Sequence, residues 1–93
     1  MRRNEMTLEE IRQEIDQVDD ALVALLEQRM NLVGQVVAFK QSNGKAVADP
    51  KREERIFARV ASKIENKDYQ ETILATFADI LKHSRAFQEK QIR

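Results

Sequence analysis

Residues 8–40 read LEEIRQEIDQVDDALVALLEQRMNLVGQVVAFK, and the spacing of their apolar side chains decides the fold. One set of positions recurs at alternating intervals of three and four residues, which is a heptad seam of about 3.5 residues per turn. The seam consists of Leu8, Ile11, Ile15, Val18, Leu22, Leu25, Arg29, Leu32, Val36 and Phe39. A pattern of this length predicts one long α-helix, and no strand pattern follows it.

Cations interrupt the apolar face of this helix. Arg29 occupies a seam position where a coiled coil prefers an aliphatic residue. Beside the seam runs a second stripe, which ends on Lys40 and reaches Arg12 when it is extended backwards; its apolar members are Val23, Leu26, Met30, Val33 and Val37. Arg29 could simply fix the helix register, and the other two could be snorkelling residues with solvated heads. Function is best sought on this face.

Composition excludes several classes of protein. The 93 residues include 16 basic and 16 acidic side chains, so the net charge is zero and argues against a nucleic-acid or membrane surface. There is no cysteine, and His83 is the single histidine, to which we assign no role. We therefore expect no disulfide, no metal site and no cofactor. The chain start lacks the apolar run of a signal peptide, so we expect a cytoplasmic protein.

Capping signals delimit the long helix. Thr7 reads as its N-cap, with Glu10 as the capping-box partner three residues later. Asn43 and Gly44 supply a left-handed terminus. Gly34 lies on the face away from both stripes, and we expect it to be tolerated without a kink.

Two shorter helices follow. Asp49 reads as the cap of the second helix, with Pro50 at its first position, and this helix is expected to end near residues 66–67. Asp68 reads as the cap of the third helix, with Glu71 as its partner, and the chain is expected to fray after about residue 90. We predict a single all-α domain over residues 1–93, with one long and two shorter helices.

The length of the first helix predicts an intertwined homodimer. About 35 residues span about 52 Å, whereas a 93-residue globule has a radius of gyration of about 12–13 Å. The shorter helices cannot cover both stripes, and antiparallel pairing of two first helices is the simplest two-fold solution. In a dimer centred near residue 24, Arg12 of the partner subunit would lie opposite about residue 36, between Arg29 and Lys40.

Other polar residues lie at unexpected positions. Ser84 occupies an apolar seam position in the third helix, and Gln88 lies one turn further on the same face. Ser84 could bond only to its own helix, Gln88 could be a surface residue, and Asp49 could be only a cap. Arg52 and Glu53 could form a solvated first turn. Taken with the cations, these residues predict a buried polar pocket for a small anion with two acidic groups.

Four motifs give the chain a family resemblance. They are the pattern of residues 11–29, the sequence VVAFK at 36–40, the D-x-x-R-E pattern at 49–53 and the S-x-x-x-Q pattern at 84–88. With these motifs the chain resembles the all-helical chorismate mutases, which are three-helix intertwined dimers. The resemblance covers nearly the whole chain, and although each motif alone is weak, their order on the predicted faces is specific.

The resemblance implies roles for five polar residues. Arg29, with Arg12 of the partner subunit, would bind the two carboxylates of chorismate, and Ser84 would assist at a carboxylate. Lys40 and Gln88 would bracket the ether oxygen, and Lys40 would also touch a carboxylate. These two are the catalytic residues that the resemblance implies.

Three residues of the second helix complete the implied site. Glu53 and the Asp49 region would hold the ring hydroxyl, and Arg52 would lie behind the residues that touch substrate. Some members of the family have a glutamate in place of Gln88, which must be protonated to donate. Because this chain carries an amide there, activity should not require acid.

The implied reaction is the pericyclic rearrangement of chorismate to prephenate in phenylalanine and tyrosine biosynthesis. It needs no nucleophile, proton transfer, metal or cofactor. The enzyme would hold the enolpyruvyl arm over the ring and would aim hydrogen-bond donors at the ether oxygen as the C–O bond breaks. The chain could also depend on a partner enzyme of the aromatic pathway, whereas no segment reads as an allosteric domain.

Two other functions compete with this one. An isochorismate pyruvate-lyase on the same scaffold would use a similar anion pocket, and substrate preference would distinguish it. A non-catalytic helical dimerisation or regulatory module would show no response of its melting temperature to a chorismate-like dianion. In such a module, Arg29→Ala and Lys40→Ala would leave folding intact and would change no ligand binding.

Overall fold

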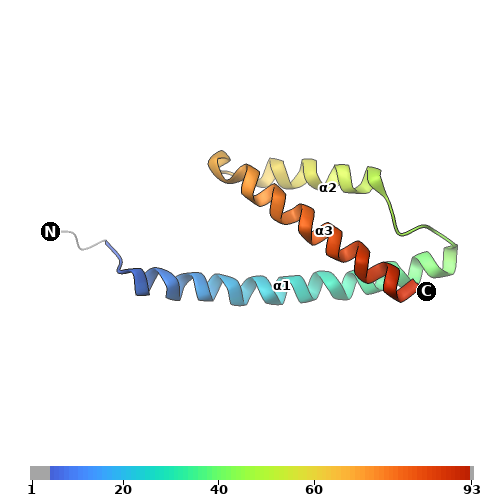
Figure 1. Cartoon of the computed structure of the whole chain (residues 1–93), viewed down its shortest axis with the longest axis horizontal. Helices are drawn as coiled ribbons and strands as arrows, with labels where there is room; N and C mark the ends of the chain where they lie inside the picture. Colours follow the sequence, from blue (N-terminus) through green and yellow to red (C-terminus); the bar gives the residue numbers. More distant parts are fainter. Residues whose placement is uncertain (1–4, 93) are drawn as a thin grey trace. The chain divides into compact units, whose positions relative to one another are not determined.

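The computed structural model describes residues 5–92, and all of the regular structure in them is helical. The elements are α1 (Leu8–Asn43), α2 (Pro50–Lys63), a short 3₁₀ helix η1 (Lys67–Tyr69) and α3 (Gln70–Ile92) (Figure 1). α1 has 36 residues, against 14 in α2 and 23 in α3. The prediction of an all-α chain with one long and two shorter helices is therefore confirmed.

Both predicted ends of α1 are formed by local hydrogen bonds. The Thr7 N–H donates to Glu10 Oε1 at 2.8 Å, and the Glu10 N–H donates to Thr7 Oγ1 at 3.1 Å, which completes the capping box. The backbone and side-chain hydrogen bonds with Thr7 lower the pKa of the Glu10 carboxyl. At the other end Gly44 has a φ of 63°, and the Lys45 N–H bonds the Lys40 carbonyl at 3.0 Å.

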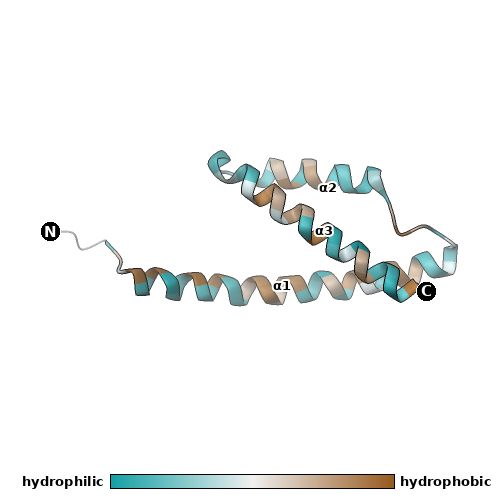
Figure 2. Ribbon diagram, in the orientation of Figure 1, coloured by the Kyte–Doolittle hydropathy of each residue, from teal (hydrophilic) through white to brown (hydrophobic). Residues whose placement is uncertain are grey.

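The two stripes of α1 differ in burial. On the second stripe, Val33 and Val37 are buried. By contrast, every apolar residue of the heptad seam is between 43% and 65% exposed; these residues are Leu8, Ile11, Ile15, Val18, Leu22, Leu25, Leu32, Val36 and Phe39. Figure 2 shows that apolar and polar residues alternate along α1. The seam is a long apolar surface that this chain does not cover itself.

The predicted end of the second helix is wrong by about three residues. α2 ends at Lys63, and Ile64 takes an extended conformation with φ −76° and ψ 117°. The Ile64 N–H bonds the Ala61 carbonyl at 3.3 Å, and its side chain is buried. Lys67 Nζ also donates to the Ala61 carbonyl at 2.9 Å, so a side-chain donor and a backbone donor both satisfy a carbonyl in the last turn of α2.

The predicted cap of the third helix is also wrong. Asn66, not Asp68, supplies the capping oxygen, since Asn66 Oδ1 accepts the Asp68 N–H at 3.0 Å. This bond starts η1, so α3 begins only at Gln70; it ends at Ile92, close to the predicted end at about residue 90. Two residues that are two positions apart could each cap a helix, and the structure uses the earlier one.

The chain divides into two units, Met1–Leu32 and Val33–Arg93, and α1 continues from the first into the second. In the second unit α2 packs on α3. Within residues 5–92, the buried apolar side chains all belong to this unit and are Val33, Val37, Ile64 and Leu81. A single domain over residues 1–93 stays a prediction. Among the described helices, none combines the length and the apolar character needed to cross a membrane.

Candidate functional site

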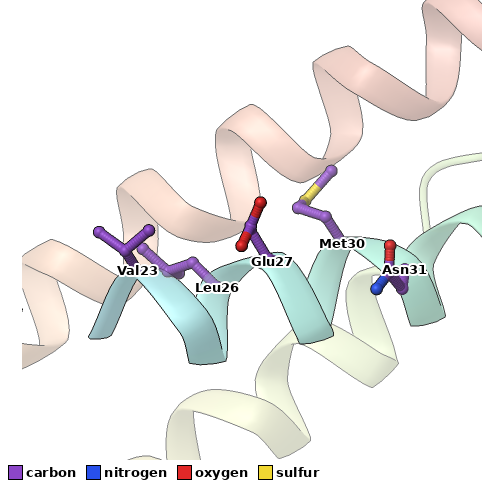
Figure 3. A pocket seen from close by; sticks show the side chains of 5 residues that line it. All are labelled: Val23, Leu26, Glu27, Met30 and Asn31. Atoms are coloured by element: carbon purple, nitrogen blue, oxygen red, sulfur yellow. The ribbon is translucent and has the colours of Figure 1, made fainter. Parts of the chain in front are cut away.

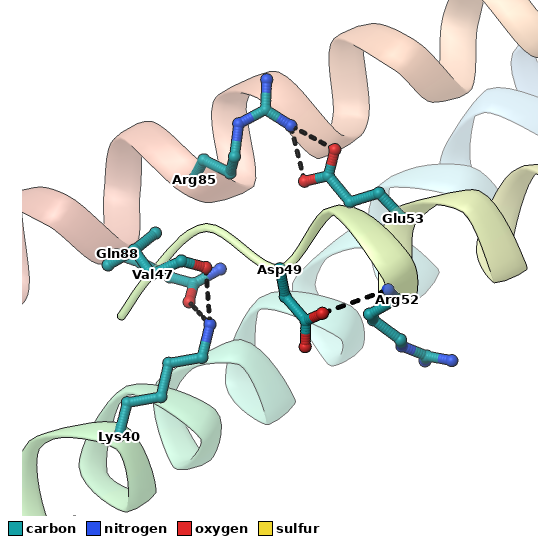
Figure 4. A network of polar contacts seen from close by, with 7 residues as sticks. All are labelled: Lys40, Val47, Asp49, Arg52, Glu53, Arg85 and Gln88. Carbon is teal, nitrogen blue, oxygen red and sulfur yellow. Dashed lines mark hydrogen bonds and ion pairs between the residues drawn. The ribbon is translucent and has the colours of Figure 1, made fainter. Parts of the chain in front are cut away.

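Lys40 is the centre of a polar cluster in the second unit. It lies in the last turn of α1 and is half-buried. Its Nζ donates to Gln88 Oε1 at 3.1 Å and to the backbone carbonyl of Val47 at 2.8 Å (Figure 4). The structure therefore brings together the two residues that the resemblance implies as catalytic, although 48 positions separate them in sequence.

Gln88, the side-chain partner of Lys40, lies on a buried face of α3. Leu81, Ser84 and Gln88 follow one another at helical spacing and are 4%, 5% and 8% exposed. The alternative reading of Gln88 as a surface residue is therefore wrong. One turn further, the Gln91 carbonyl accepts from Gln41 Nε2 at 3.0 Å, so a second hydrogen bond joins this end of α3 to α1.

Glu53 is held by a residue for which we predicted no role. Nη1 of Arg85, on α3, lies 2.7 Å from Glu53 Oε1 and 2.6 Å from Glu53 Oε2, so one nitrogen contacts both carboxylate oxygens. The side chain of Arg85 is 37% exposed and that of Glu53 is 26% exposed. Figure 4 shows the pair bridging α2 and α3.

The hydrogen bonds of Asp49 and of the Arg52 backbone lie within the first turn of α2. Asp49 Oδ1 accepts the Arg52 N–H at 3.1 Å, and the Asp49 carbonyl accepts the Glu53 N–H at 3.1 Å. Asp49 is thus the N-cap of α2, as predicted. The Arg52 side chain is exposed and extends away from Lys40 and Gln88 in Figure 4.

The two arginines expected at the substrate carboxylates belong to the first unit. Arg12 is exposed and Arg29 is half-buried. Their convergence with Lys40 stays a prediction. The same unit carries a surface depression on α1, and its lining includes neither arginine; it is formed by Val23, Leu26, Glu27, Met30 and Asn31 (Figure 3).

A second depression lies in the other unit, where the end of α2, η1 and the start of α3 meet. Its lining contains no residue of the predicted site; it is formed by Arg59, Val60, Lys63, Ile64, Glu65, Asn66, Tyr69, Ile73 and Phe77. Residues 5–92 contain no group of three histidine, cysteine or acidic side chains placed to hold a metal ion. The polar cluster around Lys40 is therefore the best-formed candidate site.

Sequence reasoning missed two contributors to this cluster. Val47 contributes a backbone carbonyl from the loop between α1 and α2, which no residue pattern could indicate. Arg85 carried a detectable signal, because it lies between Ser84 and Gln88, three residues before the latter. What remained hidden was the approach of α2 that places Glu53 beside it.

Comparison with known proteins identifies the family of this chain. A family model for chorismate mutase type II matches residues 11–89. A chorismate mutase of Methanocaldococcus jannaschii is 29% identical over 86 residues, which cover 91% of this chain and 87% of that relative. No solved structure matches significantly. Because the family match runs through all three helices and includes both Lys40 and Gln88, the chain belongs to the chorismate mutase type II family of isomerases.

Proposed function

We propose that this protein catalyses the intramolecular rearrangement of chorismate to prephenate. The observation that carries the proposal is the contact between Lys40 and Gln88, with Nζ and Oε1 3.1 Å apart, inside the region that matches the family. Gln88 is 8% exposed, so its amide is largely removed from solvent. Such a pair offers fixed donors to an oxygen that gains negative charge.

The contact between Lys40 and Gln88 leaves one N–H of Lys40 and the amide N–H groups of Gln88 for the substrate. An ammonium group has three N–H donors, and the Val47 carbonyl and Gln88 Oε1 accept two of those of Lys40. The third N–H is the one that would reach substrate. Because an ammonium cannot accept a hydrogen bond, the Gln88 carbonyl must face Lys40, and the amide nitrogen is the atom with which Gln88 would donate. Two donors would then meet at the ether oxygen as the C–O bond breaks.

The remaining site residues would orient the substrate. Arg29 and the partner subunit's Arg12 would each take a carboxylate, with Ser84 assisting, because a guanidinium matches the planar geometry of a carboxylate. Glu53 would accept the ring hydroxyl. Holding both ends of the molecule would favour the compact conformer in which the reacting carbons are close.

A homodimer is part of the proposal because the pocket would take Arg12 from a second copy. The nine apolar seam residues, each 43–65% exposed, support it. Full burial of such a side chain contributes about 1.5–3 kcal/mol, so covering the exposed half of nine would contribute about 7–13 kcal/mol per chain before entropy costs. An antiparallel copy of α1 is the partner whose seam has the same length and spacing.

The direct test is conversion of chorismate by purified protein, followed by the loss of its ultraviolet absorbance and by acid treatment of the product to phenylpyruvate. We expect Lys40→Ala to lower kcat by about 10²–10³, the effect of removing one preorganised donor. Lys45→Ala is the matched control, because Lys45 is an exposed cation five residues away whose backbone N–H alone is used.

Other outcomes would point to other functions. No conversion by a folded dimer would contradict the proposal. Formation of salicylate and pyruvate from isochorismate, with chorismate left unchanged, would indicate the lyase. A melting temperature that no chorismate-like dianion raises would indicate a non-catalytic module.

A further inference from the structure

We infer that Arg85 is a positioning residue of this site, which holds the Glu53 carboxylate in the orientation that accepts the substrate's ring hydroxyl. The inference rests on the proposed function and assigns a residue that neither the motif pattern nor the capping logic of α2 requires. It starts from the ion pair that joins α2 to α3.

The ion pair fixes the place of the Glu53 carboxylate between α2 and α3. A single nitrogen, Arg85 Nη1, lies 2.7 Å and 2.6 Å from the two oxygens of Glu53. These two short contacts restrain the distance and direction of the carboxylate from α3, and so limit the rotamers that the Glu53 side chain can adopt. Each carboxylate oxygen has a further lone pair, so Glu53 can accept a hydroxyl proton while Arg85 remains in place.

The position of Arg85 in α3 supports this role. It directly follows Ser84 and precedes Gln88 by three residues, and both of these neighbours are buried polar residues of the cluster. Lys82, by contrast, is an exposed cation in the preceding turn. Arg85 therefore lies at the edge of the polar face, where a long side chain can span to α2.

Charge provides the second reason for an arginine here. The proposed substrate is a dianion, and an isolated Glu53 carboxylate would repel it. Arg85 offsets the charge of that carboxylate, whereas the two acceptors of Lys40, the Val47 carbonyl and Gln88 Oε1, are uncharged and leave its positive charge for the substrate. Glu53 can then be used for its hydrogen-bonding capacity at a smaller electrostatic cost to binding.

The pair is too exposed to matter mainly for folding. With side chains 37% and 26% exposed, an ion pair is screened by solvent and contributes little to stability. A purely structural role would thus predict small effects on both stability and catalysis. A positioning role predicts a nearly unchanged melting temperature together with a loss of kcat/KM.

The test compares four variants in the chorismate assay. Arg85→Gln removes the charge but keeps much of the side chain, and we expect kcat/KM to fall by about tenfold to hundredfold, as for misplacement of a substrate-contacting group by about 1 Å. Arg85→Lys should retain most of the activity, because the structure uses one nitrogen only. Lys82→Gln is the matched control on the same helix and should stay within about twofold of wild type. Arg85→Ala is the fourth variant, and melting curves of all four would verify folding.

A double-mutant cycle with Glu53→Gln separates action through Glu53 from direct contact with substrate. If Arg85 acts by positioning Glu53, Arg85→Gln should have little further effect once Glu53 has been changed. An equal fall in both backgrounds would mean that Arg85 contacts substrate itself, and it would overturn the inference.

A substrate analogue provides an independent readout. Arg85→Gln should weaken the binding of a chorismate analogue without the ring hydroxyl less than it weakens the binding of chorismate, because the analogue loses only the charge compensation at Glu53 and not the positioned hydroxyl acceptor. Equal weakening for both molecules would also overturn the inference.

The outcome for wild type keeps the two proposals distinguishable. If wild type and Lys82→Gln convert chorismate while Arg85→Gln does so equally well, only the role of Arg85 is refuted. If wild type leaves chorismate unchanged, the proposed function fails and this inference fails with it.

Discussion

Gln88→Glu is the substitution that tests the chemistry of the site most sharply. It changes one amide nitrogen to an oxygen and keeps the size and shape of the side chain. The new carboxyl would lie where Gln88 Oε1 now accepts from Lys40 Nζ at 3.1 Å. In its charged form it can still accept from Lys40, but it can no longer donate to the ether oxygen. Only the neutral acid would restore that donor.

The size of the effect follows from the fraction of neutral acid. An ordinary glutamate ionises near pH ~4.3, so at pH 7 about one molecule in 500 is protonated. The Lys40 ammonium favours the charged form, whereas burial of position 88 favours the neutral acid. Because these two effects oppose each other, we expect kcat/KM at pH 7 to fall by about 500-fold, or about 3.7 kcal/mol. This agrees with the loss of about 2.7–4 kcal/mol for one preorganised donor.

The assay is kcat/KM for chorismate between pH 5 and pH 8 for wild type and for two variants. Gln88→Glu should gain activity by about tenfold for each unit of acidification, because protonation increases in that direction. The matched control is Gln91→Glu, which makes the same change three residues later on α3, where the structure uses the backbone carbonyl and the side chain is exposed. A variant at position 88 with full activity at pH 7 and a flat pH profile would refute the assignment of Gln88 as a donor.

Three further predictions concern α1. Gly34→Ala should raise the free energy of unfolding by about 0.5–1 kcal/mol in denaturant titrations, because an added Cβ meets nothing within 4 Å, and a loss of stability would mean that another surface covers this face. The pKa of Glu10 is lowered in the folded chain, so its stabilising contribution should be complete at neutral pH and should disappear as the pH falls through the folded-state pKa. Melting temperatures of wild type and Glu10→Ala should therefore converge on acidification, whereas Glu9→Ala, in the same first turn, should show a smaller difference throughout. Leu22→Glu, at a 47% exposed seam position, should shift the protein from dimer to monomer in analytical ultracentrifugation, and Ala24→Glu, on the opposite face, should not; an unchanged dimer in Leu22→Glu would contradict pairing through the seam.

The features that sequence predicted well are those that local interactions determine. The capping box of Thr7 and Glu10 and the left-handed Gly44 each involve residues within a few positions of one another, and both form as predicted. The heptad spacing of apolar side chains similarly predicts one uninterrupted helix. The backbone hydrogen bonds of that helix join residues only four positions apart. The resemblance to the family, and not the helix pattern, predicted that Lys40 and Gln88 act together although they are far apart in the sequence.

The predictions that failed depend on contacts between elements. α2 ends before Ile64, whose side chain is buried, and the turn that follows is capped by Asn66 rather than by Asp68. Both residues are good caps in isolation, so local propensity could not choose between them.

By itself, the sequence determined that this protein is helical, where α1 begins and ends, and which polar residues lie on its apolar faces. Only the tertiary structure decided that Lys40 shares its ammonium between Val47 and Gln88, and that Glu53 meets Arg85. The physical reason is that helix formation and capping act over three or four residues. A contact between side chains 32 or 48 positions apart exists only once the packing of α3 has brought their backbones within reach.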